Sequence, residues 1–215
     1  MWVPDAASDL WALRDHVESY LVEDDVLLTA RADAARSGCG PVGPDAGAGL
    51  RFLAATISAR AVVEIGTGTG VSGLWLLRGM APDGTLTSID VDPEHQRVAR
   101  GVFLAAGYGP SRLRLINGMG LDVLPRLTDA GYDLVFVDAG PAEYPRYLEE
   151  AVRLLRDGGI VVFAGALGAG VVDPEANDAG TAGLREVGRQ AREDDRLTPV
   201  LLPLGDGLLA ALKAG

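Results

Sequence analysis

A carboxylate and three glycines follow one another closely after an apolar run. Residues 62–70 read Val-Val-Glu-Ile-Gly-Thr-Gly-Thr-Gly, so Glu64 precedes Gly66, Gly68 and Gly70, and a helical apolar pattern starts at Val71. This order predicts a strand, a tight turn and a helix, with glycines where the backbone approaches a ligand closely. A phosphate site would avoid a carboxylate at the end of the strand, whereas an amine-bearing cation would gain from it. The segment therefore points to S-adenosylmethionine (SAM) as the ligand.

A nicotinamide site is the competing interpretation of the same segment. Residues 68–73 match G-x-G-x-x-G, and Asp90 ends the next apolar run about twenty residues later, which together are the fingerprint of an NAD site. Glu64 and Gly66 extend the motif upstream and place the turn two residues too early for NAD, so we favour SAM. In either case the Asp90 carboxylate can accept hydrogen bonds from two ribose hydroxyls. The simpler alternative for Asp90 is a helix-capping or solvated turn residue.

Composition restricts the classes of protein that the chain can represent. It has 215 residues, 48% of them hydrophobic, and a formal net charge of −11, which argues against general nucleic-acid binding. Cys39 is the one cysteine, so a disulfide framework and a multi-cysteine metal site are excluded, and we interpret it as a packed loop residue rather than a catalytic thiol. Residues 1–20 lack the basic start of a signal peptide, and run 160–172 is too short to cross a membrane. We expect a cytoplasmic protein.

Strand and helix signals alternate along most of the chain. We predict strands at 61–65, 85–90, 112–116, 132–138 and 159–164. We predict helices at 71–79, 93–106, 120–128, 143–156 and 179–193, after two helices within 8–37 and one at 46–58. Two apolar runs, 197–204 and 208–212, flank an Asp-Gly turn and predict a β-hairpin. The expected fold is α/β, a Rossmann-like, doubly wound, mostly parallel seven-stranded sheet closed by an antiparallel C-terminal hairpin. We expect one domain over 1–215, with N-terminal helices in 1–59 and the Rossmann-like core in 60–215.

An ordered set of motifs gives the chain a family resemblance from about Pro44 to its C-terminus. The matching segments are Pro44–Gly47, Val63–Gly70, Gly73–Leu76, Ser88–Glu94, Tyr132–Ala139, Tyr144, Tyr147–Glu149, Leu154–Gly159 and Leu202–Leu208. Taken together, they resemble class I SAM-dependent methyltransferases, and more closely the catechol and caffeoyl-CoA type O-methyltransferases. The resemblance implies that SAM is the cofactor, that S-adenosylhomocysteine (SAH) is the product, and that the protein is a homodimer.

The resemblance also implies a set of residues around the cofactor. Glu64, Gly66 and Gly70 are expected at its methionine and ribose end, together with Thr67, Gly68 and Ser72 of the same turn. Asp90 is expected to hold the ribose hydroxyls and Val91 to lie against the adenine. Gly118 and Met119 are expected at the adenine edge, and Asp138 beside the methionine part. In the family, Asp138 is also the first of three ligands for a divalent cation.

The chain departs from the family at the residues that bind the metal ion and at the lysine taken as the catalytic base. The family usually reads Asp-Ala-Asp-Lys where this chain has 138–141 as Asp-Ala-Gly-Pro, so the lysine taken as the base is replaced by Pro141. The fifth strand usually ends in Asp-Asn, whereas here it ends in Ala164 and Gly165, which offer no side-chain oxygen. Because Mg²⁺ needs several oxygen ligands, we predict that no metal site remains.

Another base must then act on the acceptor, or the acceptor must itself be acidic. Asp138 is the first candidate and Asp173 the second, while His16 and His95 are interpreted as surface helix residues. Aromatic side chains interpreted as packing residues are Trp75, Tyr144, Tyr147 and Phe163.

The sequence thus predicts a SAM-dependent O-methyltransferase for a small phenol- or catechol-like acceptor, working without a metal, with no nucleic-acid or membrane partner. A non-catalytic SAM- or SAH-binding protein is the alternative, and an NAD-dependent oxidoreductase is a third.

Overall fold

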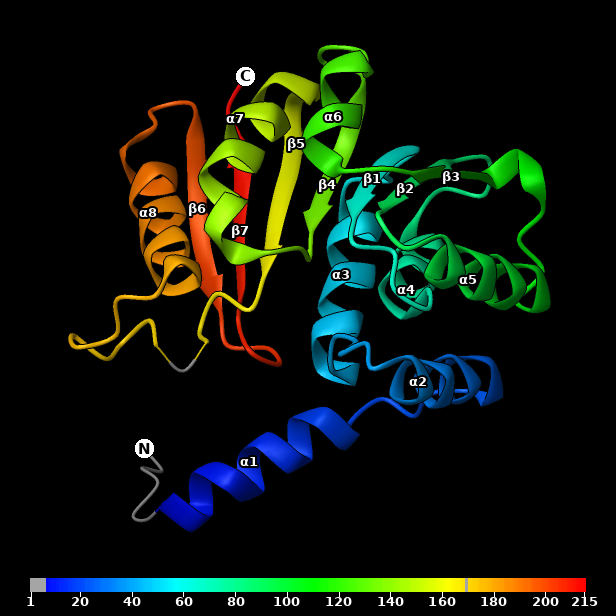
Figure 1. Cartoon of the computed structure of the whole chain (residues 1–215), viewed down its shortest axis with the longest axis horizontal. Helices are drawn as coiled ribbons and strands as arrows, with labels where there is room; N and C mark the ends of the chain where they lie inside the picture. The colour runs from blue at the N-terminus through cyan, green and yellow to red at the C-terminus, as the bar shows by residue number, and fades with distance from the viewer. Residues whose placement is uncertain (1–6, 169) are drawn as a thin grey trace.

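A twisted seven-stranded sheet forms the centre of the protein, in the order β3-β2-β1-β4-β5-β7-β6 (Figure 1). The computed structural model describes residues 7–168 and 170–215. The strands are β1 (Ala61–Ile65), β2 (Thr85–Asp90), β3 (Leu113–Asn117), β4 (Tyr132–Val137), β5 (Leu155–Ala164), β6 (Leu197–Leu202) and β7 (Leu208–Lys213). Strands β1 to β5 pair in parallel, and β7 pairs antiparallel with both β5 and β6. The predicted fold class, including the closing hairpin, is confirmed.

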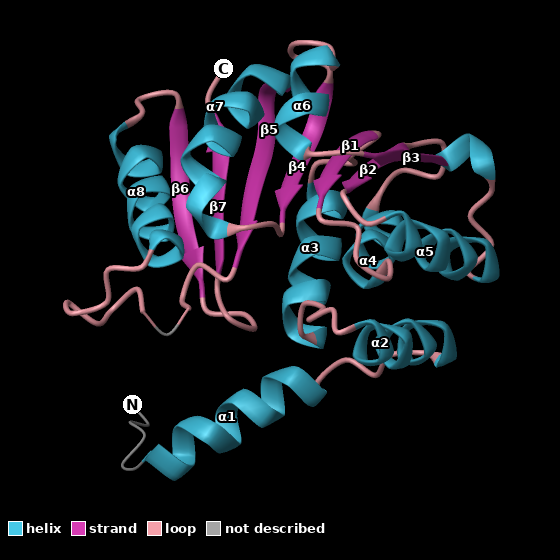
Figure 2. Ribbon diagram, in the orientation of Figure 1, coloured by secondary structure: helices cyan, strands magenta, loops and turns pink. Residues whose placement is uncertain are grey.

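Helices cover both faces of the sheet (Figure 2). They are α1 (Ala7–Ser19), α2 (Asp25–Ser37), α3 (Pro44–Thr56), α4 (Val71–Gly79), α5 (Pro93–Ala105), α6 (Gly120–Val123), α7 (Tyr144–Leu154) and α8 (Ala179–Glu193). Alternate residues of β4 show the two layers. Phe136 packs in one cluster with residues of α2 to α5, whereas Val135 and Val137 pack in a second cluster with residues of α6 to α8. The apolar runs of the central strands arise because both faces are covered.

Two elements differ from the prediction for local reasons. The predicted helix 120–128 ends as an α-helix at Val123 and continues as a 3₁₀ turn, Leu124–Arg126, because Pro125 cannot continue the α-helical hydrogen bonding. Strand β5 starts at Leu155, four residues before the predicted start, and so includes the Asp-Gly-Gly segment that suggested only a helix stop. The register of β5 against β4 shifts between Tyr132 and Leu134, so the early part of the strand is irregular.

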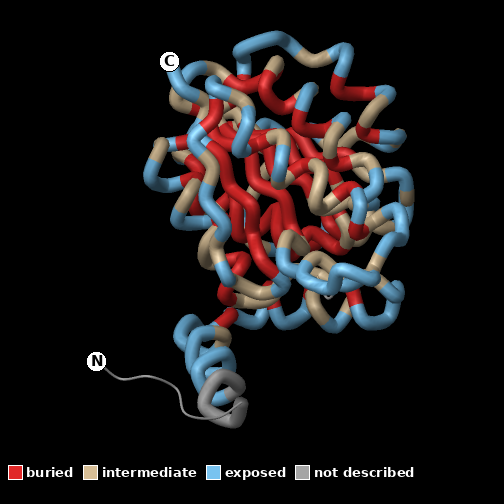
Figure 3. The backbone as a smooth tube through the Cα atoms, turned by 90° about the vertical axis from the view of Figure 1, so that its left-hand side faces the viewer, coloured by how far each residue is buried: buried red, intermediate tan, exposed pale blue. Residues whose placement is uncertain are grey.

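The N-terminal helices differ in how they join this core. Leu27 of α2 and Leu50 of α3 are fully buried in the same cluster as residues of the sheet. Helix α1 projects from the body and its described side chains are mostly exposed (Figure 3), although Arg14 reaches Asp206 of the β6–β7 turn at 3.5 Å. Residues 1–6 of the predicted extension lie outside the described residues. Helices α2 and α3 therefore share a core with the sheet. The division between residues 59 and 60 stays a prediction.

Candidate active site

The turn between β1 and α4 is fixed against the end of β4. Gly66 has φ +95°, and a Cβ there would lie 2.0 Å from the carbonyl oxygen of Asp138. The Asp138 backbone N–H donates to the carbonyl of Ile65 at 2.8 Å, which holds the two strand ends together. Position 66 therefore accepts only glycine, because both its backbone conformation and the approach of β4 exclude a side chain.

A cavity of about 480 Å³ opens beside this turn, at the carboxyl ends of β1, β2 and β4. The strand order reverses between β1 and β4, which is where open α/β sheets bind their ligands. Nine of the predicted cofactor residues line the cavity: Gly66, Thr67, Gly68, Ser72, Asp90, Val91, Gly118, Met119 and Asp138. Glu64 and Gly70 are not among the lining residues.

Glu64 is fully buried behind the cavity wall. Its carboxylate accepts hydrogen bonds from the Ser72 hydroxyl at 2.7 Å and the Ser88 hydroxyl at 2.5 Å. The Thr67 hydroxyl lies 2.6 Å from the Ser88 hydroxyl and continues this chain toward the cavity. Burial raises the pKa of Glu64 to about 7. Glu64 therefore lies behind the turn rather than among the lining residues, and its charge acts on the cavity from there. Its place at the methionine end of the cofactor stays a prediction.

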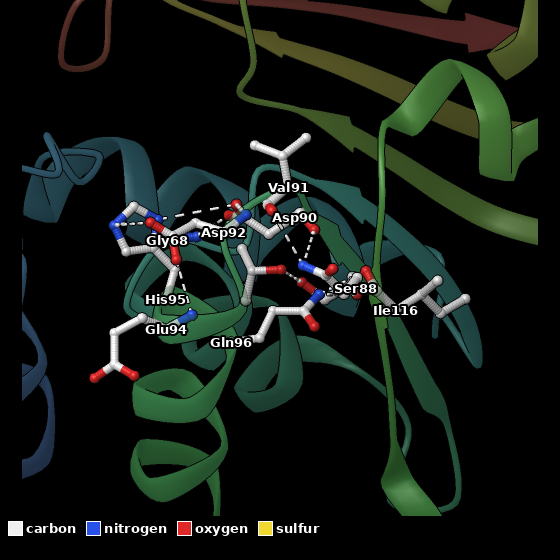
Figure 4. A network of polar contacts seen from close by, with 11 residues as sticks. Gly68, Ser88, Asp90, Val91, Asp92, Glu94, His95, Gln96 and Ile116 are labelled. Carbon is white, nitrogen blue, oxygen red and sulfur yellow. Dashed lines mark hydrogen bonds and ion pairs between the residues drawn. The ribbon is translucent and has the colours of Figure 1, made fainter.

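Asp90 is held rigidly at the tip of β2 (Figure 4). One carboxylate oxygen accepts from the backbone N–H of Gly68 at 2.8 Å, and the other accepts from that of Asp92 at 2.9 Å. The Asn117 amide donates to the carbonyls of Asp90 and Val91, both at 3.1 Å, and ties the tip to β3. Each carboxylate oxygen can accept a further hydrogen bond, so Asp90 is oriented by the backbone and can still bind two donors in the cavity.

His95 joins the cavity wall, which the sequence interpretation as a surface residue missed. Its Nδ1 lies 3.9 Å from a carboxylate oxygen of Asp90, and its Nε2 lies 3.9 Å from one of Asp92 (Figure 4). The available signal was its position in the first turn of the helix that follows Asp90, where a side chain reaches back toward the strand end. His16 is exposed on α1 and Asp173 is exposed in the loop after β5, and neither lines this cavity.

Apolar side chains stand exposed at the rim of the cavity. Val91 is 66% exposed and Met119 is 53% exposed, although both are large apolar residues beside a cavity that Ile89 also lines. Cys39 is half-buried in the wall, and burial raises the pKa of its thiol. Tyr147 is buried and lines the cavity as well, so it both packs α7 and borders the site. Such a rim suits a flat apolar ring system.

A second cavity of about 290 Å³ adjoins the first and shares Asp138 with it. Its walls come from α1, the loop before α3, the end of β5 and the β6–β7 turn. The lining residues are Arg14, Glu18, Gly40, Pro41, Val42, Gly43, Ala46, Asp138, Ala164, Gly165, Leu204, Gly205, Asp206, Gly207 and Leu208. Burial raises the pKa of Asp138 to about 6. Its carboxylate has no hydrogen-bond partner within 7–168 and 170–215.

The residues beside Asp138 do not fit a divalent metal ion. Ala164 ends β5 and Gly165 follows it, both lining the second cavity without side-chain oxygens. The part of the chain that the structure describes holds no group of three or more His, Cys, Asp or Glu side chains placed to bind a metal. A hard cation in near-octahedral geometry would need several such oxygens, so a single carboxylate does not make the site.

The packing residues predicted from the sequence are in place. Trp75 and Phe163 are buried in the core, and the buried Tyr144 hydroxyl donates to the carbonyl of Ala164 at 3.1 Å. No helix among the described residues has the length and apolarity needed to cross a membrane.

Comparison with known proteins identifies the family to which this arrangement belongs. The family profile described as O-methyltransferase matches residues 18–214. The chain belongs to the O-methyltransferase family. Its relatives in this family include a protein of Mycolicibacterium vanbaalenii, provisionally named an O-methyltransferase, that is 56% identical over 203 residues, covering 94% of this chain and 90% of the relative. A Mycobacterium tuberculosis protein with the same provisional name is 54% identical over 211 residues, covering 98% and 93%.

Solved structures, among them two named O-methyltransferases, share the fold. A protein from Corynebacterium glutamicum superposes with a TM-score of 0.89 at 36% identity, covering 96% of this chain and 98% of that one. The O-methyltransferase TomG of Streptomyces achromogenes, involved in tomaymycin synthesis and crystallised with SAM, has a TM-score of 0.86 at 31% identity, covering 98% and 100%. An O-methyltransferase from Bacillus cereus, crystallised with SAH, has a TM-score of 0.84 at 26% identity, covering 95% and 99%.

Proposed function

We propose that the protein is a SAM-dependent O-methyltransferase for a small phenol- or catechol-like acceptor, and that it works without a divalent metal. The observation that carries the proposal is the position of Asp138, whose carboxylate borders both the larger cavity and the smaller one. A group placed there is beside the methyl donor on one side and the acceptor hydroxyl on the other. The family and the SAM-bound neighbours support the choice of methyl donor.

The residues of the larger cavity fit SAM. Among the described lining residues there is no lysine or arginine, while Asp90, Asp138 and Glu143 supply carboxylates. That charge suits a cationic ligand and disfavours the pyrophosphate of NAD. Asp90 would hold the ribose hydroxyls, Val91 and Met119 would border the adenine, and Gly66 lets the backbone approach. When bound, SAM supplies a methyl group carried on a positively charged sulfur.

Asp138 is the base in this proposal. With its pKa near 6, the carboxylate is ionised at neutral pH and can take the proton of an acceptor hydroxyl as that oxygen becomes nucleophilic. A phenol with a pKa near 10 gains from such a base, which typically contributes about 10²- to 10⁴-fold. The desolvated surroundings that raise the pKa also strengthen the pull of the carboxylate on the proton.

Replacing the base tests this assignment. We expect Asp138→Asn to lower kcat about 100-fold or more. It should also remove the rise of kcat/KM for SAM that we expect of the wild-type protein through about pH 6, because kcat/KM reports the ligand-free protein. Transfer of a labelled methyl group from SAM to a panel of phenols, measured from pH 5 to 9 with and without EDTA, gives both quantities. Asp173→Asn is the matched control, because Asp173 is exposed and lines neither cavity.

The outcomes separate the proposal from its alternatives. Loss of turnover on EDTA treatment, restored by Mg²⁺, would contradict metal independence. SAH binding with no methyl transfer to any phenol would favour the non-catalytic SAM- or SAH-binding protein instead. An Asp173→Asn variant as impaired as Asp138→Asn would move the role of base to the loop after β5.

The assembly and location of the protein are further parts of the proposal. By analogy with the family we expect a homodimer, which light scattering on the purified protein checks, and a cytoplasmic location without nucleic-acid partners.

A further inference from the structure

The rim of the larger cavity has room for a flat ring next to Asp90. Val91 follows Asp90 directly, and the Asn117 amide donates to the carbonyls of both residues, which fixes this part of the rim against β3. Met119 comes two residues after Asn117 and, like Val91, is a largely exposed apolar side chain that lines the cavity. With ribose hydroxyls on the Asp90 carboxylate, the nucleobase of the ligand would lie between Val91 and Met119.

Contact with these two side chains does not by itself select one nucleobase. Dispersion contacts from Val91 and Met119 accept any purine, and a thioether is only a weak hydrogen-bond acceptor. Adenine and hypoxanthine differ at the edge that carries the exocyclic group, because adenine has an amine that donates there and hypoxanthine has a carbonyl that accepts. Selection of adenine therefore requires an acceptor at that edge of the ring.

Glu143 places a carboxylate close to Met119. It has helical backbone angles just before α7, and Tyr147 follows four residues later, so the two side chains lie on one face of the helix and both line the larger cavity. A Cβ added at Gly120, the residue after Met119, would lie 2.8 Å from the Tyr147 hydroxyl. Burial, and after it the charge of Glu143, raises the pKa of Tyr147 to about 12, as expected for a carboxylate near this hydroxyl.

The Glu143 carboxylate keeps acceptor positions for a ligand. Its contact with Arg146 is 3.8 Å long, and the two side chains are 37% and 67% exposed, so this ion pair is weak. The other two lining carboxylates face different parts of the site. Asp90 is held by backbone N–H groups at the tip of β2, and Asp138 lies at the end of β4 beside the second cavity.

We propose that Glu143 makes the site specific for adenine, by accepting a hydrogen bond from the exocyclic amine while Val91 and Met119 contact the ring. Hypoxanthine in the same position would turn its carbonyl oxygen toward the carboxylate, so that two acceptors would face each other without a donor. This inference rests on the proposed use of SAM and extends it to the residue that recognises the nucleobase.

Three product analogues with the same net charge test this recognition. SAH carries the exocyclic amine, S-inosylhomocysteine carries a carbonyl in its place, and the corresponding analogue with unsubstituted purine carries neither group. Calorimetry on the full chain measures the dissociation constant of each. We expect SAH to bind about 10-fold more tightly than S-inosylhomocysteine, with the purine analogue between them, because the partial exposure of Glu143 limits the effect.

Two substitutions of Glu143 separate hydrogen bonding from a structural effect. In Glu143→Gln the amide can turn either its oxygen or its NH₂ group toward the ring, so SAH and S-inosylhomocysteine should bind almost equally. Glu143→Ala removes the acceptor, and it should weaken SAH about 5-fold while leaving S-inosylhomocysteine no weaker than in the wild-type protein. Glu149→Gln is the matched control, because it removes an exposed carboxylate of α7 that does not line the larger cavity and should keep the wild-type ratio.

Equal affinity of the wild-type protein for SAH and S-inosylhomocysteine would overturn the inference, as would a Glu143→Gln variant that keeps the wild-type preference. Equal weakening of all three analogues in Glu143→Ala would overturn it as well, since that result marks a structural role. The proposed function fails differently, by absence of SAH binding to the wild-type protein, or by selective binding of SAH without methyl transfer to any phenol.

Discussion

The buried carboxylate of Glu64 links the cofactor turn to the stability of the fold. Its pKa is about 7 in the folded chain, against an ordinary value of 4.5, because burial disfavours the ionised form. Between these pH values the folded chain holds a proton that the unfolded chain has released. Stability therefore falls as pH rises from about 4.5 to 7 and then levels off, a loss of about 3 kcal/mol from this group.

Glu64→Gln should remove that loss. An amide keeps the size of the side chain and can bond both Ser72 and Ser88, but it has no charge to bury. Between pH 5 and 8, we expect the ligand-free wild-type protein to lose about 2 to 3 kcal/mol more of its free energy of unfolding than the ligand-free variant loses. Urea denaturation at each pH measures the difference. Equal slopes in the two proteins would show that Glu64 is not desolvated as the structure indicates.

Asp138 serves as a comparison for this measurement. Its pKa is raised from 3.8 to about 6, so Asp138→Asn should flatten the same curve over a lower pH window.

Close approach between helices α3 and α4 places the loop that borders both cavities. Gly47 of α3 lies against Trp75 of α4, and a Cβ at position 47 would come 2.3 Å from the indole ring. Trp75 is itself buried, and its Nε1 donates to Glu23 at 3.2 Å, so the ring has little room to move. The glycine lets α3 pack closely and so brings the preceding residues, 40–43, to the cavity walls.

Gly47→Ala should destabilise the protein by about 1 to 3 kcal/mol, because the extra methyl forces the indole out of place. Gly101→Ala is the matched control, since Gly101 is an exposed helical glycine of α5 with nothing within 4 Å of an added Cβ. It should gain about 0.5 to 1 kcal/mol from helix propensity. Thermal and urea unfolding compare the two, and a Gly47→Ala variant as stable as Gly101→Ala would contradict the packing described here.

The electrostatics of the whole molecule predict that SAM binding is coupled to proton release. Glu64 and Asp138 both have raised pKa values in the ligand-free protein, and a cation bound in the larger cavity would favour the ionised form of both. Protons should therefore leave on binding near pH 6 to 7, and SAM affinity should rise about 10-fold from pH 5.5 to 8.

Calorimetry in two buffers with different ionisation enthalpies counts the protons released. SAH lacks the charge on sulfur, so its affinity should depend less on pH than that of SAM. The coupling would be refuted by a SAM affinity that stays constant over this range.

Local signals were sufficient for most of the fold and for much of the cavity wall. The strand–turn–helix at 61–79 follows from an apolar run, three glycines and a helical period, all of which act between near neighbours. The same is true of the Asp-Gly turn between β6 and β7. The local patterns do not predict the 3₁₀ turn at Pro125 or the early start of β5 at Leu155. At both places the sequence signal marks the end of a helix without specifying the structure that follows.

Local sequence patterns do not predict the direction in which a side chain points. Glu64 lies behind the cavity wall, where serines of α4 and β2 donate to its carboxylate, and no local pattern predicts that direction. His95 was interpreted as a surface residue, yet the approach of α5 to the end of β2 brings it beside Asp90.

Residue types and short spacings establish the order of elements, the glycine turn, the carboxylate at the tip of β2 and the lack of side-chain oxygens at the end of β5. Each depends on residue type and short spacing, which the chain states directly. Which charges share a cavity follows from the folded arrangement of distant segments. Arg14 and Asp206 are 192 residues apart in the chain, and their contact beside Asp138 exists because helix α1 and the β6–β7 turn meet there once the sheet has formed.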